Sequence, residues 1–122
     1  MRLLLDTVAF LRWHAGSLKP PTVKTVQRAQ LVCVSAVSAW EIAIKAALGK
    51  VRFDGSVEDA VRAYGFAELP VAMRHGDRVG ALPLHHPDPF DRMLIAQAVE
   101  EGLTILTSDR VFEKYQVAVE WA

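Results

Sequence analysis

Residues 88 to 106 read DPFDRMLIAQAVEEGLTIL, and they predict a buried helix followed at once by a strand. Asp88 can cap the helix, Pro89 fits its first turn, and Gly102 follows its end. The apolar residues between them cover most of the helix circumference, so we expect this helix to pack against a sheet. The apolar run 103–106 supplies a strand of that sheet.

On both sides of this segment, short apolar runs alternate with patterns of helical spacing. The predicted strands are 3–5, 31–34, 66–69, 103–106 and 117–119, and the predicted helices are 7–14, 21–29, 38–49, 56–64, 73–81, 89–101 and 109–115. This order is typical of a parallel sheet, in which each strand returns through a helical crossover. We therefore predict an α/β fold, a single domain over residues 1–122 with a parallel sheet of about five strands and helices on both faces.

The composition is that of an ordinary globular protein. Of the 122 residues, 52% are hydrophobic and 23% are charged, which excludes wholesale disorder. Lys+Arg and Asp+Glu number 14 each, so the zero formal charge excludes a uniformly basic surface for nucleic acid, although not a local basic patch. Cys33 is the one cysteine, which excludes an internal disulfide and fits a reducing compartment. No apolar run approaches the ~20 residues of a membrane span and no targeting signal is visible, so we expect a cytoplasmic protein without membrane contact.

Four acidic residues fall where strands end or where the following helix begins. Asp6 ends the first strand, and Asp109 follows the strand at 103–106. Glu41 and Asp91 lie in the first turns of two later helices. Because the carboxyl ends of parallel strands meet at one edge of a sheet, these four side chains are candidates for one site.

Each acid also has a purely structural explanation. Asp6 and Asp109 can cap the helices that follow them, because acidic residues are favourable at helix N-termini. Glu41 can close a capping box with Ser38, and it can also pair with Lys45 one turn further on. Asp91 can form a looser version of the same capping box with Asp88.

Taken together, the four acids are harder to explain as caps. Two like charges about 4 Å apart repel by about 4 kcal/mol at an effective dielectric of roughly 20, so a converging cluster needs protons or a bound cation. Oxygen ligands without cysteine select Mg²⁺ or Mn²⁺ over Zn²⁺. A metal-assisted phosphoryl-transfer site is therefore the function that these residues favour if they converge.

Four segments, which together span most of the chain in order, resemble the PIN-domain ribonucleases, and specifically the VapC-type toxins of bacterial toxin–antitoxin pairs. They are LLLDT at 3–7, SAVSAWEIAIK at 35–45, HPDPFDRMLIAQ at 86–97 and LTSDRVF at 106–112. The third segment is the most specific of them. The resemblance implies a PIN-like three-layer sandwich and a Mg²⁺- or Mn²⁺-dependent endoribonuclease that inhibits translation as a toxin.

By this resemblance, Asp6, Glu41, Asp91 and Asp109 match the acidic quartet that holds the metal and positions the attacking water. Asp6 and Asp91 match the most direct ligands, whereas Glu41 and Asp109 act through water or at a second cation. All four are therefore candidates for both the catalytic and the metal-binding role.

The resemblance also implies supporting residues and partners. Thr7 and Thr107 match hydroxyls that support the acids. The implied partners are single-stranded or looped RNA as the substrate, a second copy of the chain in a homodimer, and a cognate antitoxin that inserts a segment near the acids and inhibits.

Several polar residues in the same motifs have two interpretations. We interpret Asp88 as the N-cap of its helix rather than as a fifth acid of the site. His85 and His86 are interpreted as loop or RNA-contact residues rather than as metal ligands, and they should point to opposite sides of an extended segment. Arg92 and Arg110 fit an RNA phosphate and a structural carboxylate partner equally well.

Aromatic residues and the remaining histidines have alternative interpretations as well. Trp40 lies on the apolar face of its helix, so we interpret it as a core residue rather than as a surface for RNA bases. The helix that carries Trp13 is a candidate for the dimer or antitoxin surface. His14 and His75 are expected at the surface. The local cations available for RNA include Arg12, Lys45, Lys50 and Arg52.

Two other functions stay open. One is a phosphatase on a similar sheet, although a haloacid-dehalogenase-type site needs an Asp two residues after Asp6, where this chain has Val8. The other is a catalytically inactive RNA- or antitoxin-binding module. A P-loop nucleotide site has no support, because Val51 follows Gly49-Lys50 where Ser or Thr is required.

Overall fold

The leucine run near the N-terminus forms the centre of a five-stranded parallel sheet. In the computed structural model, which describes all 122 residues, β1 (Arg2–Leu5) pairs with β2 (Leu31–Ser35) on one side and with β4 (Thr104–Thr107) on the other. β3 (Ala67–Leu69) lies beyond β2 and β5 (Val119–Trp121) lies beyond β4, so the order is β3-β2-β1-β4-β5. Every pairing is parallel, which confirms the predicted α/β fold.

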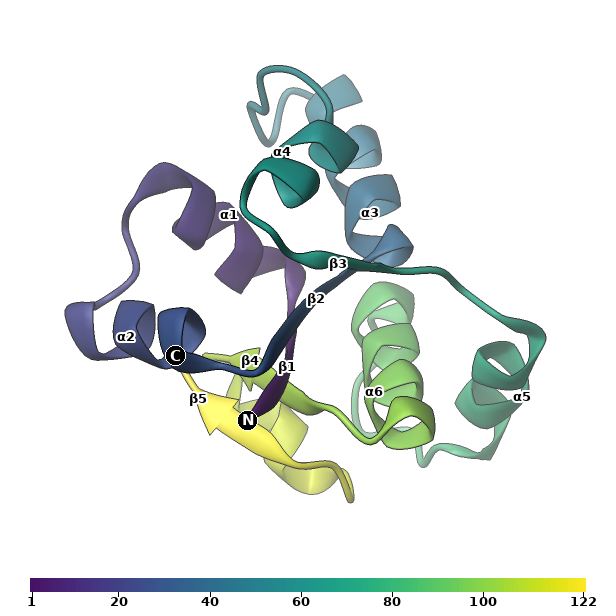
Figure 1. Cartoon of the computed structure of the whole chain (residues 1–122). Helices are drawn as coiled ribbons and strands as arrows, with labels where there is room; N and C mark the ends of the chain where they lie inside the picture. The colour runs from purple at the N-terminus through teal and green to yellow at the C-terminus, as the bar shows by residue number, and fades with distance from the viewer.

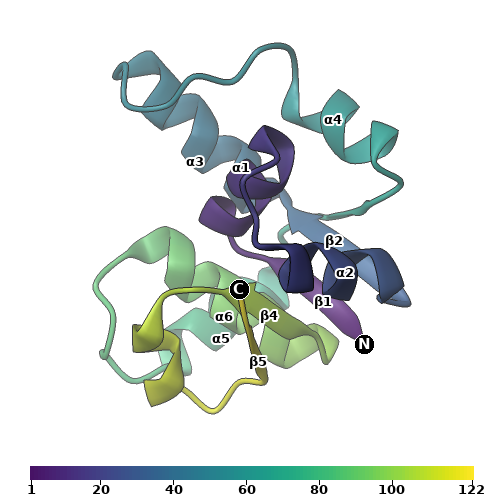
Figure 2. The ribbon, with the colours of Figure 1, turned by 90° about the vertical axis from the view of Figure 1, so that its left-hand side faces the viewer.

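Helices connect the strands and cover both faces of the sheet. They are α1 (Thr7–Ala15), α2 (Pro20–Arg28), α3 (Ala36–Ala47), α4 (Val57–Ala63), α5 (Met73–Ala81), α6 (Pro89–Glu101) and the short 3₁₀ helix η1 (Arg110–Lys114). Figure 1 shows α1 and α2 on one side of the sheet and α5 and α6 on the other. Both views show α3 and α4 at the opposite end of the molecule from η1 (Figure 1, Figure 2).

The sheet has a separate apolar core on each face, because successive side chains of a strand point in opposite directions. Leu3 and Leu5 pack with Phe10 of α1 on one face. Leu4 packs with Ile95 of α6 on the other face. The middle of α6 is buried nearly all round, as its apolar circumference predicts.

The strand order places a topological switch point at the centre of the sheet. From β1 the chain crosses to β2 and then to β3, whereas the next crossover carries it back over β1 to β4. The segments that leave the carboxyl ends of β1 and β4 therefore diverge, and a crevice forms between them, which is where open α/β sheets bind their ligands. Asp6 follows β1 and Asp109 follows β4, so both acids lie at this switch point.

Two elements, β5 and α3, are shifted from the predictions by two residues, and the others differ by at most one residue at either end. β5 spans 119–121 rather than 117–119, and it pairs in register with residues 105–107 of β4. α3 begins at Ala36, since the Ser35 hydroxyl accepts a hydrogen bond from Val37 N (3.0 Å) and caps the helix, a role that the sequence suggested for Ser38.

Trp40 is a surface residue, and its predicted place in the core is wrong. The buried face of α3 consists of Val37, Ser38, Glu41 and Ile42. At about 100° per residue, Trp40 points about 130° away from the centre of that face, and 61% of its surface is exposed.

His75 is buried, and its predicted place at the surface is also wrong. Only 1% of its surface is exposed, because α5 packs along α6 and encloses the ring. Its Nδ1 accepts a hydrogen bond from Ala72 N (2.9 Å), and its Nε2 donates to Glu101 Oε1 (2.8 Å), so both ring nitrogens are satisfied.

None of the helices combines the length and apolarity that crossing a bilayer would demand.

Candidate functional site

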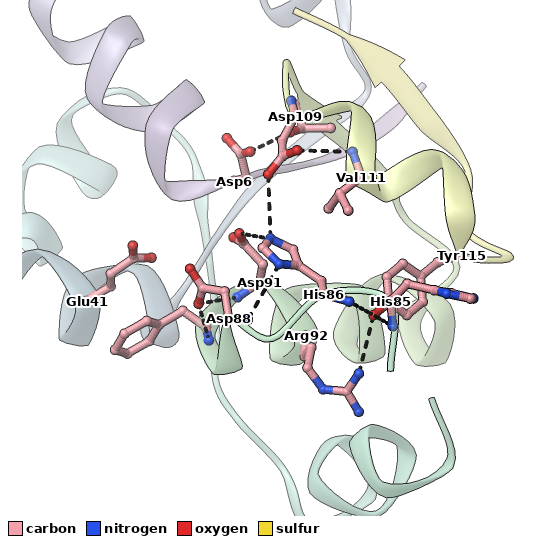
Figure 3. Close-up of polar contacts among 12 residues, drawn as sticks. Asp6, Glu41, His85, His86, Asp88, Asp91, Arg92, Asp109, Val111 and Tyr115 are labelled. Atoms are coloured by element: carbon pink, nitrogen blue, oxygen red, sulfur yellow. Dashed lines mark hydrogen bonds and ion pairs between the residues drawn. The ribbon is translucent and has the colours of Figure 1, made fainter. Parts of the chain in front are cut away.

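The four predicted acids come from four different elements near the carboxyl end of the sheet. Asp6 is the N-cap of α1, Asp109 is the N-cap of η1, Asp91 lies in the first turn of α6, and Glu41 lies within α3. Figure 3 shows Asp91 and Asp109 at the same edge of the His86 ring, next to its Nε2, with Asp6 beside Asp109. Glu41 reaches the group from α3, close enough to raise the pKa of Asp6.

Asp6 is a buried carboxylate, and each of its two oxygens accepts a hydrogen bond from a different part of the chain. Its Oδ1 accepts a hydrogen bond from Ala9 N (2.8 Å), which is the capping role that the sequence allows. Its Oδ2 accepts from the Thr107 hydroxyl (2.5 Å), and only 5% of the residue is exposed. Burial raises the pKa of Asp6 above its ordinary value, and the charges of Asp109 and Glu41 raise it further. Capping therefore explains one of its oxygens, and Thr107 of β4 holds the other.

Asp109 divides its oxygens in the same manner. Its Oδ1 accepts from Val111 N (3.0 Å) and caps η1, while its Oδ2 lies 3.5 Å from His86 Nε2. The Thr107 hydroxyl that donates to Asp6 also accepts from Asp109 N (3.0 Å). One threonine of β4 thus fixes the positions of both acids.

Asp91 has no capping role, and its electrostatic environment is the most perturbed in the site. Its Oδ2 accepts a hydrogen bond from His86 Nε2 (2.9 Å). The pKa of Asp91 is raised to about 7: burial is the largest cause, the nearby charges of Asp88 and Asp6 contribute, and His86 opposes the shift. A carboxyl group in this position needs a proton or a cation at neutral pH.

Glu41 is buried with one oxygen satisfied and one free. Its Oε2 forms an ion pair with Lys45 Nζ (2.5 Å), which confirms the predicted i,i+4 pair. Its Oε1 is buried and has no hydrogen-bond partner. The predicted capping box is wrong, because the Ser38 hydroxyl bonds instead to the Thr7 hydroxyl (2.9 Å). An orphaned buried carboxylate oxygen is unfavourable unless a water or a cation reaches it.

His86 is a central part of this group, which sequence reasoning did not anticipate. Its backbone N–H donates to the Tyr115 hydroxyl (2.8 Å), and this contact holds the loop before α6 against the end of η1. Asp88 N donates to its Nδ1 (3.5 Å), so Nε2 carries the ring proton that faces Asp91. The ring of His85 faces Tyr115 instead (centroids 5.2 Å apart), which confirms that the two histidines point to opposite sides.

Asp88 takes the N-cap role that the sequence predicts. Its Oδ1 accepts from Phe90 N (2.8 Å) and Asp91 N (3.3 Å). His86, Asp88 and Asp91 nevertheless offer ligand atoms that lie within 4.8 Å of one another, which is close enough for one cation. This set shares only Asp91 with the predicted quartet, so two ligand sets overlap in the site.

The two arginines that follow quartet acids do not face the cluster. Arg92 directs its guanidinium to three backbone carbonyls and to the Tyr115 hydroxyl, which corrects the expectation of an RNA phosphate or a carboxylate partner. Arg110 pairs with Glu113 (3.0 Å) and lies 4.1 Å from the ring centre of Trp121. Lys45 is therefore the one lysine or arginine that forms an ion pair with any of the acids in the site.

The donor set fits a hard divalent cation. Carboxylate oxygens predominate, an oxygen of Glu41 is buried without a partner, and burial raises the pKa of both Asp6 and Asp91. A cation would relieve the mutual repulsion and supply the missing partner at the same time. Mg²⁺ and Mn²⁺ are the ions that such oxygen ligands prefer.

Comparison with solved structures finds the same fold in toxin–antitoxin complexes. VapBC2 from Rickettsia felis, bound to a DNA fragment from its promoter, aligns with a TM-score of 0.76 at 11% identity over 100% of this chain and 99% of that chain. DNA-bound VapBC from Salmonella typhimurium gives 0.72 at 15% identity, over 99% and 98%. A toxin–antitoxin complex from Klebsiella pneumoniae gives 0.64 at 13% identity, over 90% and 89%.

Sequence comparison identifies the family directly. No curated protein matches the chain by sequence. The family model described as the PIN domain, however, matches residues 3–118, which include all four acids at the carboxyl end of the sheet. Because this match covers nearly all of its residues, the chain belongs to the PIN domain family.

Proposed function

We propose that the protein is an endoribonuclease that hydrolyses RNA phosphodiester bonds with Mg²⁺ or Mn²⁺. The observation that carries the proposal is the gathering of Asp6, Asp91 and Asp109 without any lysine or arginine paired to them. PIN domains are in general nucleases, which supports hydrolysis of a phosphodiester. A cluster of carboxylates repels a bare phosphate, so the substrate needs a bridging cation.

In this proposal, Asp6 and Asp91 hold the ion directly, and Glu41 and Asp109 act through water or at a second ion. When bound, the ion supplies charge neutralisation of the phosphate and lowers the pKa of a coordinated water. Thr107 keeps the Asp6 carboxylate in one orientation through its hydroxyl. The free Oε1 of Glu41 is an acceptor that can orient the attacking water. The water oxygen bonds to phosphorus, the bond to the leaving sugar oxygen breaks, and one proton passes from the water to that oxygen.

The biological role in this proposal is that of a toxin that inhibits translation and is held by a cognate antitoxin. The support is the likeness in fold to the VapBC and toxin–antitoxin complexes over nearly the whole chain. A homodimer in the cytoplasm is part of the same proposal. RNA would approach past cations that flank the acids, among which Arg12 lies 3.4 Å from Ser108 beside Asp109, and Lys45 contacts Glu41.

The decisive experiment compares wild type with Asp6→Asn and Asp91→Asn on single-stranded RNA. Both variants should fold and should lose cleavage, because Asn removes a negative oxygen without a change of size. Mg²⁺ or Mn²⁺ should raise the melting temperature of the wild type, since only the native state binds the ion, and should raise that of the variants less. Cleavage at the wild-type rate by either variant would contradict the assignment.

The two rival functions predict different results in the same assays. A phosphatase would hydrolyse a small phosphomonoester and leave RNA intact. An inactive binding module would bind metal and RNA but cleave neither substrate. The presence of all four acids near the carboxyl end of the sheet supports the endoribonuclease.

A further inference from the structure

An exposed aromatic ring stands beside the acidic site. Trp40 of α3 is 61% exposed, and its ring packs edge to face on Phe90 with centroids 5.1 Å apart. Phe90 lies in the first turn of α6, between Asp88 and Asp91. Glu41 directly follows Trp40 in the chain. The ring therefore packs on the first turn of α6, which also carries Asp91.

The same ring forms one wall of an apolar hollow. The hollow has a volume of about 610 Å³, which is within the range of sites that bind small organic groups. Its wall includes His86, whose Nε2 hydrogen-bonds to Asp91, so the hollow adjoins the acidic site. Its apolar lining includes Val71, Leu84, Pro87, Pro89 and Met93.

We propose that Trp40 is a base-stacking residue, and that an unpaired nucleobase of the RNA lies against its ring in this hollow while the neighbouring phosphate lies at the acids. The proposal rests on the proposed function, because it concerns the same substrate. It assigns a base-binding subsite to a residue whose exposure no contact within the chain explains.

Stacking suits the chemistry of this surface. Every base has an apolar face, and aromatic side chains bind that face with little preference for sequence. Apart from His86 and Arg92, the hollow has few polar groups, and Arg92 is occupied with backbone carbonyls, so it offers little hydrogen-bond readout of base edges. Only an unstacked base can enter, because the bases of a duplex face one another. The subsite therefore selects single-stranded or looped RNA.

A second copy of the chain is the rival occupant of an apolar hollow. The position of the hollow favours the base, because its walls include His86, whose Nε2 donates to Asp91, and Trp40, whose ring packs on Phe90 beside Asp91. An occupant of that space touches the acidic site as well as the ring. A nucleotide satisfies both contacts with its base and its phosphate.

The experiment measures kcat and KM for cleavage of a short single-stranded RNA by wild type, Trp40→Ala and Trp40→Phe. Removal of a stacked ring should lower kcat/KM about ten-fold, mainly through KM, and Phe should restore most of the loss. Leu48→Ala is the matched control, because Leu48 is an exposed apolar residue (64%) that ends the same helix about 12 Å further along. Its kcat/KM should equal that of the wild type.

Abasic RNA completes the test as a double-mutant cycle. Abasic sites are placed singly at each nucleotide around the cleaved bond. At one position the loss of the base should lower kcat/KM for wild type, and Trp40→Ala should then add no further loss. The mass of each variant in solution is measured at the assay concentration.

The outcomes separate this inference from the proposed function. If wild type cleaves RNA and Trp40→Ala is equally efficient, the stacking subsite is overturned and the endoribonuclease stands. Additive losses at every abasic position also overturn the subsite. If Trp40→Ala instead converts a dimer into a monomer, the hollow is an interface between copies and the base proposal is wrong. If wild type cleaves no RNA, both proposals fall together.

Discussion

The Thr107 hydroxyl donates a hydrogen bond to the Asp6 carboxylate at 2.5 Å, although the two residues are 101 positions apart in the chain. The parallel pairing of β1 with β4 brings them together, because Asp6 directly follows β1 and Thr107 is the last residue of β4. The bond lowers the pKa of Asp6 against the larger effect of burial, which raises it. Thr107 therefore helps to keep Asp6 in the charged form that a cation needs.

Thr107→Val should weaken metal binding while the protein stays folded. Valine has nearly the same shape, so the change removes the hydroxyl that donates to Asp6 and accepts from Asp109 N. The loss of such a bond to a charged group corresponds to about 1.5–3 kcal/mol, or roughly ten-fold or more in Mg²⁺ affinity. Calorimetric titration measures this, with Thr104→Val on the same strand as the control. An unchanged affinity would show that Asp6 does not depend on Thr107.

The raised pKa of Asp91 predicts an unusual dependence of stability on pH. In the metal-free protein this carboxyl has a pKa of about 7, against an ordinary value of 3.8. Between these values the folded protein holds a proton that the unfolded chain releases, so Asp91 stabilises the fold at low pH and this contribution is lost as pH rises toward 7. Urea unfolding in the presence of EDTA, from about pH 4 to about pH 7.5, measures the slope.

Asp91→Asn is the control for that slope, because an amide does not titrate. The variant should lose the part of the pH dependence that belongs to Asp91 and should be the more stable protein near pH 7 without metal. Saturating Mg²⁺ should restore the stability of the wild type at pH 7 by competing with the proton. An identical pH profile for variant and wild type would contradict the raised pKa.

His86 should compete with the metal rather than bind it. Its Nε2–H donates to Asp91 and lies 3.5 Å from Asp109 Oδ2, so the ring occupies oxygens that a cation requires. His86→Ala should therefore tighten Mg²⁺ binding by up to about ten-fold, which calorimetric titration measures. His85→Ala, whose ring faces Tyr115, should have no effect. Weaker binding by His86→Ala would identify His86 as a ligand in the set with Asp88 and Asp91.

The fold could be predicted from the sequence because its main signals are local. The leucines of β1 and the apolar helix after Asp88 each show their structure within a few residues. The convergence of Asp6 and Asp109 also follows from strand order, because both stand where central parallel strands end.

The details of the site depend on contacts between distant segments, which a local pattern does not contain. Ser38 and Glu41 of α3 are buried and Trp40 is exposed, the reverse of what hydrophobicity indicates, because α3 turns its polar residues toward the site. His86 is oriented by Tyr115, 29 positions away. No periodicity in the sequence reports that contact.

Arg92 should stabilise the fold and position the loop that carries His86, without a direct part in catalysis. It is 9% exposed, and its guanidinium donates to the carbonyls of Val79, Leu82 and Pro83 and to the Tyr115 hydroxyl, at 2.8 to 3.4 Å. Arg92→Met should lower the free energy of unfolding by about 3 kcal/mol, because buried carbonyls lose a charged donor. Urea unfolding measures the change.

Arg92→Lys distinguishes the geometry of the guanidinium from its charge. Lysine keeps the charge but has one nitrogen, so it cannot donate to carbonyls on several residues at once. The free energy of unfolding of Arg92→Lys should therefore fall nearly as far as that of Arg92→Met. The matched control is Arg78→Ala, which breaks an ion pair with Glu100 at the surface and should cost well under about 1 kcal/mol. Hydrogen exchange at the His86 amide should quicken in both Arg92 variants, because the segment from Val79 to His86 loses its anchor. If Arg92→Lys matches the wild type in both measurements, charge alone holds the loop and the arrangement of donors is irrelevant.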